Sequence, residues 1–91
     1  MPFLEDTVDV ILYHHERFDG NGYPEGLEGD KIPLTARIVS VADTIDAMTR
    51  DRPYRNALSL SQLIDELKKG AGTQFDPEIV KLINDNKIKL F

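Results

Sequence analysis

Residues 14–24 read HHERFDGNGYP, and this stretch decides how the chain folds on either side of it. Its two histidines are the only ones in the chain. Apolar residues before it recur at helical spacing and predict a helix over residues 3–16: Leu4, Val8, Ile11 and Leu12. Because successive helical residues are about 100° apart, His14 and His15 are expected to flank a buried apolar stripe. The stretch therefore predicts two imidazoles at the end of a helix, followed at once by a loop.

The loop itself is predicted over residues 19–33, DGNGYPEGLEGDKIP, which hold four glycines and two prolines. That composition is incompatible with the interior of a helix or strand. The loop is longer than the usual connection of about 4 to 6 residues, and long ordered loops in small domains tend to be functional. By its composition alone it could equally be a plain surface linker.

Three further helices follow, over residues 34–49, 60–69 and 77–85. The first carries an apolar stripe of Leu34, Ile38, Val41, Ile45 and Met48. Ser59 and Gln62 form a capping box for the second, which Gly70 closes. Asp76 and Pro77 open the last, where Phe75 and Val80 are placed as a hydrophobic staple. The tail KIKLF alternates like a short strand, but the fold class is mainly α with no convincing sheet.

Length and charge exclude several classes of protein. Ninety-one residues form one domain or part of one. Eleven basic and sixteen acidic residues give a net charge of −5, which disfavours a nucleic acid polymer or a membrane surface as partner. The absence of cysteine excludes disulfides and thiolate metal sites. Nothing resembles a signal peptide or an apolar run of about 20 residues, so a cytoplasmic location is expected.

The candidate chemistry lies in a few polar side chains. Crossing helices could bring His14, His15 and Asp43 together as metal ligands, with Asp43 a buried carboxylate, although histidines at a helix end often only complement its dipole. Asp46 and Arg50 are spaced as a surface ion pair, for which we expect a structural role. Three arginines within six residues could clamp a phosphate or form a solvated turn: Arg50, Arg52 and Arg55.

Taken together, these motifs resemble the HD-GYP family, a bacterial branch of the HD-domain metal-dependent phosphohydrolases. The family pattern HHExxDGxGYPxGLxGxxIPxxARIxxxxDxxDAxxxxRPYRxAxS is matched by residues 14–59, and GxxFDPxxV is matched by residues 72–80. The match covers nearly the whole chain after the first predicted helix.

The resemblance implies a cyclic di-GMP phosphodiesterase of bacterial signal transduction. In such enzymes two or three iron or manganese ions hold a bridging hydroxide that opens the 3'-5' phosphodiester, giving pGpG and sometimes GMP. It implies that His14, His15 and Asp43 are metal ligands and that Arg52 and Arg55 contact substrate phosphates. Gly22, Tyr23 and Pro24 correspond to the loop that names the family and are assigned to substrate binding.

The chain departs from the family pattern in one important respect. The family also requires a His-Asp pair, a further histidine and a lysine from upstream helices, and this chain has no third histidine. Residues 1–91 are therefore expected to be a partial HD-GYP domain that lacks the upstream HD half and is inactive alone. They are expected to hold at most one ion weakly and to expose helix faces that favour self-association. The alternative is a non-enzymatic signalling module that binds partner proteins, such as GGDEF-type proteins, through the GYP loop.

Overall fold

The protein is described here by a computed structural model that covers residues 2–86, with side-chain surroundings from residue 7 onward. Its elements are α1 (Pro2–Tyr13), the 3-10 turn η1 (Gly29–Lys31), α2 (Leu34–Met48), α3 (Leu60–Gly70) and α4 (Pro77–Asp85). Residues 2–86 contain isolated β-bridges but no sheet, which confirms the mainly α fold. The KIKLF tail, with its predicted strand, lies outside the described residues.

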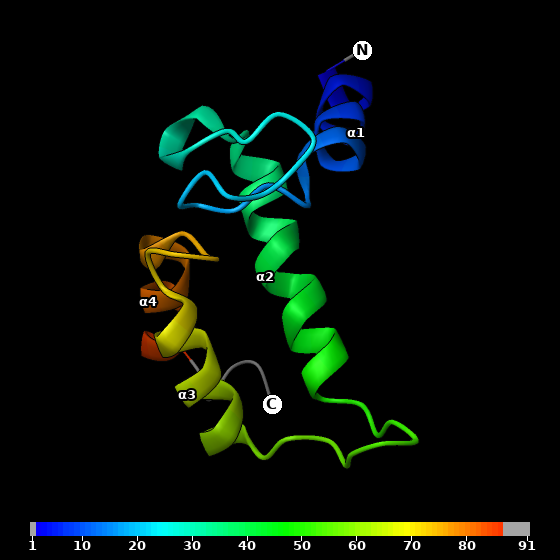
Figure 1. The fold of residues 1–91 in the computed structure, drawn as a ribbon, viewed down its shortest axis with the longest axis vertical. Helices are drawn as coiled ribbons and strands as arrows, with labels where there is room; N and C mark the ends of the chain where they lie inside the picture. The colour runs from blue at the N-terminus through cyan, green and yellow to red at the C-terminus, as the bar shows by residue number, and fades with distance from the viewer. Residues whose placement is uncertain (1, 87–91) are drawn as a thin grey trace.

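α2 runs through the molecule and carries a different loop at each end (Figure 1). The glycine-rich loop and α1 lie at its N-terminal end, and α1 packs against it. Residues 49–59 leave its C-terminal end and lead to α3, which lies with α4 along the other side of the molecule. None of the helices in residues 2–86 has the length and hydropathy of a membrane-crossing segment.

The core forms where α2, α3 and α4 meet. Its buried side chains are Val41, Leu63, Leu67, Phe75 and Val80. Gly70 lets the Phe75 ring approach, because a Cβ at residue 70 would lie 2.7 Å from that ring. The predicted staple residues Phe75 and Val80 thus share one cluster. This small core places α2 against the C-terminal helices and leaves the other face of α2 to α1 and the loop.

The predicted helix ends are largely confirmed. Both hydrogen bonds of the capping box between Ser59 and Gln62 are present at the start of α3. Asp76 caps α4 by accepting from the backbone N–H of Glu78 at 2.9 Å. The first helix is the exception, because it ends at Tyr13 rather than residue 16. Glu16 N–H donates to the Tyr13 carbonyl at 3.0 Å, closing a turn that leads the chain into the loop.

The apolar stripe predicted to be buried beside the histidines is largely exposed. Val8, Ile11 and Leu12 are 50%, 65% and 48% exposed, because no other element in the described residues covers this face of α1. Leu34 and Ile38, near the start of α2, are also exposed. The expectation of a buried stripe was therefore wrong for α1 and for the first turns of α2. A separate expectation, that a partial domain would expose apolar helix faces, is confirmed by the same residues.

One ion pair ties α2 to the start of α4. Arg37 donates through Nη1 to the Asp76 carboxylate at 2.6 Å and through Nε to the Ile32 carbonyl at 2.9 Å. The two charged side chains are 15% and 5% exposed. Since Asp76 also caps α4, this contact fixes the segment before α4 relative to the end of the glycine-rich loop.

Candidate functional site

The His14 imidazole is oriented by its own helix. Its Nδ1 lies 2.8 Å from the Val10 carbonyl oxygen. A carbonyl can only accept, so Nδ1 carries the hydrogen and the lone pair of the neutral ring is on Nε2. Histidines that bind metals usually donate their other ring N–H to a carbonyl or carboxylate in this way. The contact therefore prepares His14 for use as a ligand through Nε2.

The His15 imidazole contacts two other rings. Its imidazole centroid lies 3.9 Å from that of His14, with the planes tilted by 41°. The Tyr23 ring also stacks on His15, with a centroid distance of 4.9 Å and an interplanar angle of 19°. The tyrosine that names the GYP loop is thus in contact with the histidine pair.

The histidines and Asp43 line one cavity of about 290 Å³. The turn after α1 contributes His14, His15, Glu16 and Arg17, while α2 contributes Ser40, Asp43 and Thr44, and Gln74 completes the lining. The structure thus brings together the three residues predicted as metal ligands. Asp43 is exposed rather than buried, because no other element in the described residues covers its face of α2.

These donors are of the right chemical type for a metal but do not form a closed site. Imidazole and carboxylate suit zinc, iron and manganese. Among the side chains of residues 7–86, however, no group of three His, Asp or Glu residues is arranged to hold an ion. The expectation that the three could hold one ion weakly was therefore wrong for these residues alone.

Glu16, the residue after the histidine pair, organises the loop. The residue is 3% exposed, and its carboxylate accepts three backbone hydrogen bonds from across the loop. The donors are Glu25, Gly26 and Leu27, at 2.7, 3.0 and 2.8 Å. No separate role was predicted for Glu16 from the sequence. One feature of the sequence could have indicated this role. Glu16 follows the histidine pair and precedes a glycine-rich loop, whose backbone N–H groups require acceptors.

Gly22 explains why the loop lies so close to the histidines. A Cβ at this position would lie 2.4 Å from the backbone nitrogen of Arg17 and 2.5 Å from the carbonyl oxygen of His15. The next residue, Tyr23, donates its backbone N–H to the His15 carbonyl at 3.3 Å and is joined to Pro24 by a cis peptide bond. Gly22 thus has a close-contact role in the structure, and its predicted contact with substrate stays a prediction.

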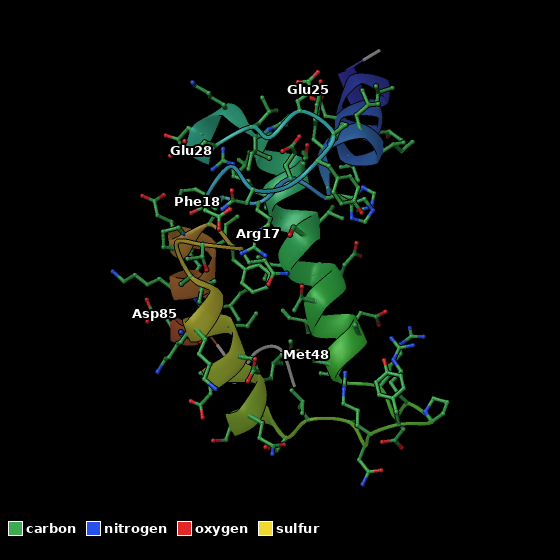
Figure 2. The ribbon with its side chains drawn as sticks, in the orientation of Figure 1. Arg17, Phe18, Glu25, Glu28, Met48 and Asp85 are labelled. Atoms are coloured by element: carbon green, nitrogen blue, oxygen red, sulfur yellow. The ribbon has the colours of Figure 1, made fainter. Side chains whose placement is uncertain are left out.

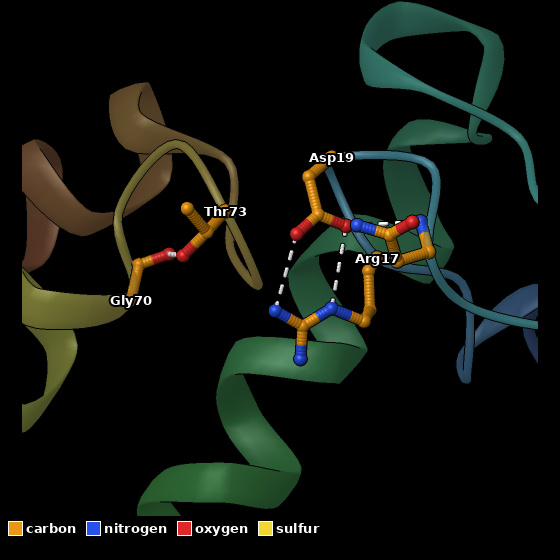
Figure 3. Close-up of polar contacts among 5 residues, drawn as sticks. Arg17, Asp19, Gly70 and Thr73 are labelled. Carbon is orange, nitrogen blue, oxygen red and sulfur yellow. Dashed lines mark hydrogen bonds and ion pairs between the residues drawn. The ribbon is translucent and has the colours of Figure 1, made fainter.

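Arg17 and Asp19 form a paired contact at the mouth of the loop (Figure 3). Arg17 donates through Nε and Nη2 to the two Asp19 oxygens at 3.3 and 3.2 Å, and Asn21 N–H donates to the same carboxylate at 2.9 Å. The Arg17 guanidinium, followed by the Asn21 N–H, lowers the pKa of Asp19 below its usual 3.8. The Asp19 backbone N–H donates in turn to the Thr73 carbonyl at 2.8 Å, which joins the loop to the segment before α4.

The arginines predicted to contact phosphates lie beyond the C-terminal end of α2. Figure 2 shows Met48 at this end, far along the helix from Glu25 in the glycine-rich loop. Arg52 and Arg55 exchange both backbone hydrogen bonds across a tight turn. Arg55 donates from its guanidinium to the carbonyls of Ala47 and Asn56, both at 3.1 Å, whereas Arg52 is exposed. Neither lines the histidine cavity.

The ion pair predicted between Asp46 and Arg50 is present. Arg50 donates to Asp46 at 3.0 Å on the surface of the last turn of α2, and the two side chains are 67% and 61% exposed. This confirms the structural role expected for Asp46.

The fold and this site define an all-α protein in which a histidine pair and a helix carboxylate share a polar cavity beneath a glycine-rich loop. The family follows from comparison with known proteins. The chain belongs to the HD-domain family, whose model, described as "HD domain", matches residues 1–79. The relatives below confirm the resemblance that the motifs indicated.

The curated relatives are cyclic dinucleotide phosphodiesterases. The chain is 42% identical over 80 residues to a cyclic di-GMP phosphodiesterase of Thermotoga maritima, covering 88% of this chain and 22% of the relative. It is 42% identical over 88 residues to a cyclic di-GMP phosphodiesterase response regulator of Xanthomonas campestris pv. campestris, covering 97% and 23%. A 3'3'-cGAMP-specific phosphodiesterase of Vibrio cholerae is 39% identical over 80 residues, covering 88% and 15%.

A solved structure shares the fold. The crystal structure of a cyclic GMP-AMP specific phosphodiesterase of V. cholerae matches with a TM-score of 0.78 and 27% sequence identity, covering 89% of this chain and 18% of that one. The chain thus spans less than a quarter of the length of these relatives.

Proposed function

We propose that the chain is part of a metal-dependent phosphodiesterase that hydrolyses cyclic di-GMP. The observation that carries the proposal is the shared cavity of His14, His15 and Asp43, in which His14 keeps Nε2 available. HD-domain phosphodiesterases are metal-dependent in general. In this proposal the three residues are metal ligands, and ligands from outside the described residues complete a centre of two or three iron or manganese ions.

The proposed substrate is a cyclic dinucleotide. Relatives named for cyclic di-GMP and for cGAMP both match this chain, and cyclic di-GMP is the more frequent name among the matches of highest similarity. We assign Arg52 and Arg55 to substrate phosphates, and Gly22, Tyr23 and Pro24 to the loop beside the bound nucleotide. Tyr23 supports this assignment through its exposed ring stacked on His15. The product would be pGpG, or GMP after a second hydrolysis.

The activity is proposed for the larger domain and not for these 91 residues alone. No three-donor group is formed among residues 7–86, and the chain matches less than a quarter of each relative. Without further ligands the cavity offers an imidazole pair and one carboxylate, which is too few for a centre of several ions.

The test is a chimera in which this chain follows the upstream segment of the Thermotoga maritima relative. With manganese or ferrous iron it should hydrolyse cyclic di-GMP, whereas the 91-residue chain should not. In the chimera, His14→Ala and His15→Ala should each lower the bound metal measured by elemental analysis, while Asp46→Ala, outside the cavity, should leave it unchanged. Unchanged metal content in both histidine variants would refute the ligand assignment.

A non-enzymatic signalling module is the competing proposal. The specific observation in its favour is that Glu16 orders the GYP loop through three backbone hydrogen bonds, which leaves Tyr23 exposed at the surface of the loop. A folded, metal-loaded chimera without turnover on any cyclic dinucleotide would favour it. Its proposed partners would be GGDEF-type proteins that bind the loop. In either proposal the location is cytoplasmic, where a nucleotide second messenger would be met.

Self-association is proposed only for the isolated chain. Its basis is the apolar surface of α1 and the first turns of α2, with Val8, Ile11, Leu12, Leu34 and Ile38 all exposed. Apolar side chains exposed together on helix faces favour association. Sedimentation of the isolated chain at increasing concentration would test it, with a constant monomer mass as the contrary result.

A further inference from the structure

Arg17 is the cation of the histidine cavity. Of the residues that line this cavity, Arg17 alone carries a permanent positive charge. Two acidic residues also line the cavity, Glu16 and Asp43. The Glu16 carboxylate already accepts three backbone N–H groups, so it is not free to bind another group. A phosphate that approached the histidines would therefore meet a single permanent cation, the Arg17 guanidinium.

The guanidinium is oriented and only partly used. Its Nε and Nη2 face the Asp19 carboxylate, and Asp19 is itself tied to the Asn21 and Thr73 backbone. Nη1 has no hydrogen-bond partner among the described residues, and in Figure 3 it points away from Asp19. Arginine forks suit phosphate oxygens, and a fork held on one edge presents its remaining N–H groups with little further loss of freedom.

The other candidate arginines are placed differently. The Arg55 guanidinium donates hydrogen bonds to the Ala47 and Asn56 carbonyls, and Arg52 lies in the same turn beyond α2. Met48 ends α2 five residues after Asp43, about 7.5 Å further along the helix axis. Neither arginine lines the histidine cavity, so the cation available to a phosphate bound there is Arg17.

We propose that Arg17 is a further substrate-binding residue, which contacts a phosphate oxygen of the nucleotide at the histidine cavity through Nη1. Asp19 is its positioning residue. The proposal rests on the proposed function for the identity of the nucleotide, but phosphate binding by Arg17 can be measured without turnover.

The test follows the arginine side-chain signals of the 91-residue chain by NMR during separate titrations with cyclic di-GMP and inorganic phosphate. The Arg17 signals should shift saturably with cyclic di-GMP. Arg17→Gln should weaken its binding about tenfold, the effect of one charge-assisted hydrogen bond. The matched control is Arg50→Gln, which removes an arginine already paired with Asp46 outside the cavity and should bind like the parent chain.

The outcomes are separable. Equal affinity for cyclic di-GMP in the parent, Arg17→Gln and Arg50→Gln chains overturns the proposal. The proposal is also overturned if the Arg17 signals shift saturably with neither cyclic di-GMP nor inorganic phosphate. If Arg17→Gln loses the folded spectrum, Arg17→Lys carries the test. Its ammonium keeps the charge without the fork, so weaker binding supports the proposal and parent-like binding overturns the role of the guanidinium. Binding through Arg17 together with an inactive, metal-loaded chimera would uphold this site and refute the proposed hydrolysis.

Discussion

The Glu16 carboxylate accepts a 2.7 Å hydrogen bond from the backbone N–H of Glu25, nine residues further along the chain. Gly26 and Leu27 donate to the same side chain, so one buried carboxylate satisfies three successive backbone groups. The loop that bears Tyr23 is thereby fixed to the residue next to His15. The shape of the histidine cavity thus depends on a side chain whose oxygens both face the loop.

Replacing Glu16 by Gln should loosen this loop. The amide keeps one acceptor, but its NH₂ group faces backbone donors, so we expect a loss of about 2 to 3 kcal/mol, as for a buried charge-assisted contact. Hydrogen exchange at the amides of residues 25–27 and urea denaturation would measure it. The control is Glu28→Gln, an exposed acid in the same loop, which should change stability by less than about 0.5 kcal/mol. Equal protection of the three amides in both variants would contradict the role of Glu16.

Gly22 should tolerate no side chain. In Gly22→Ala the added carbon would meet backbone atoms of His15, Glu16 and Arg17 within 2.7 Å, and backbone cannot move aside as a flexible side chain would. We expect a loss of about 2 to 3 kcal/mol and a weaker nuclear Overhauser effect between the rings of His15 and Tyr23. Gly72→Ala is the control. Its φ of +85° costs about 1 to 2 kcal/mol, but nothing lies within 4 Å of the added carbon. The account would be disproved if the two variants lost similar stability and both kept the contact between the His15 and Tyr23 rings.

The ion pair between Arg37 and Asp76 should contribute far more than the one between Arg50 and Asp46. Removing one partner of a nearly buried pair leaves the other charge uncompensated, which costs about 3 kcal/mol. The exposed pair should contribute about 0.3 to 0.5 kcal/mol. Arg37→Met and Arg50→Met, compared by urea denaturation, form a matched test. Equal losses in the two variants would show that burial does not set the difference.

Acid should release the loop anchor at Asp19. Its pKa is lowered in the folded state, chiefly by Arg17, so the folded protein favours the carboxylate more than the unfolded chain does. The stabilisation is therefore fully present above the unfolded pKa, near 4, and is lost as the pH falls through the folded value. The Asp19 carboxyl carbon, followed by NMR, should titrate below 3.8, and Arg17→Gln should move its midpoint upward. If the Asp19 carboxyl of the parent chain titrated with a midpoint at or above 3.8, Arg17 would not stabilise its charged form and this prediction would fail.

How far the sequence could predict this structure depends on how local each signal is. The starts of α3 and α4 were predicted correctly, because Ser59, Gln62, Asp76 and Pro77 act within one helical turn of themselves. The end of α1 was missed by three residues, since periodicity continues to residue 16 while the Glu16 side chain turns toward the loop. That turn depends on contacts nine to eleven residues away.

The site shows the same division. The motif indicated that His14, His15 and Asp43 would share one site, and all three line the same cavity. The exposure of Asp43 could not be anticipated, because it depends on which elements cover α2. The pairing of Arg37 with Asp76 spans 39 residues and has no local signature in either helix. The stacking of Tyr23 on His15 likewise depends on Gly22 lying against the histidine backbone. Long-range acceptors and close backbone approaches were thus the features that periodicity and capping rules could not supply.

The two arginines beyond α2 should separate under mutation if they bind substrate phosphates. Arg55 anchors its turn to the Ala47 carbonyl, so Arg55→Gln should cost about 1 kcal/mol of stability as well as substrate affinity. Arg52 is exposed, so Arg52→Gln should leave stability unchanged. In the active chimera, each variant should raise the KM for cyclic di-GMP by no more than about 1.5 to 3 kcal/mol, roughly 10- to 150-fold, with kcat little changed. If KM is unchanged in both variants and only Arg55→Gln loses stability, the turn holds no phosphate and its arginines serve the end of α2 alone.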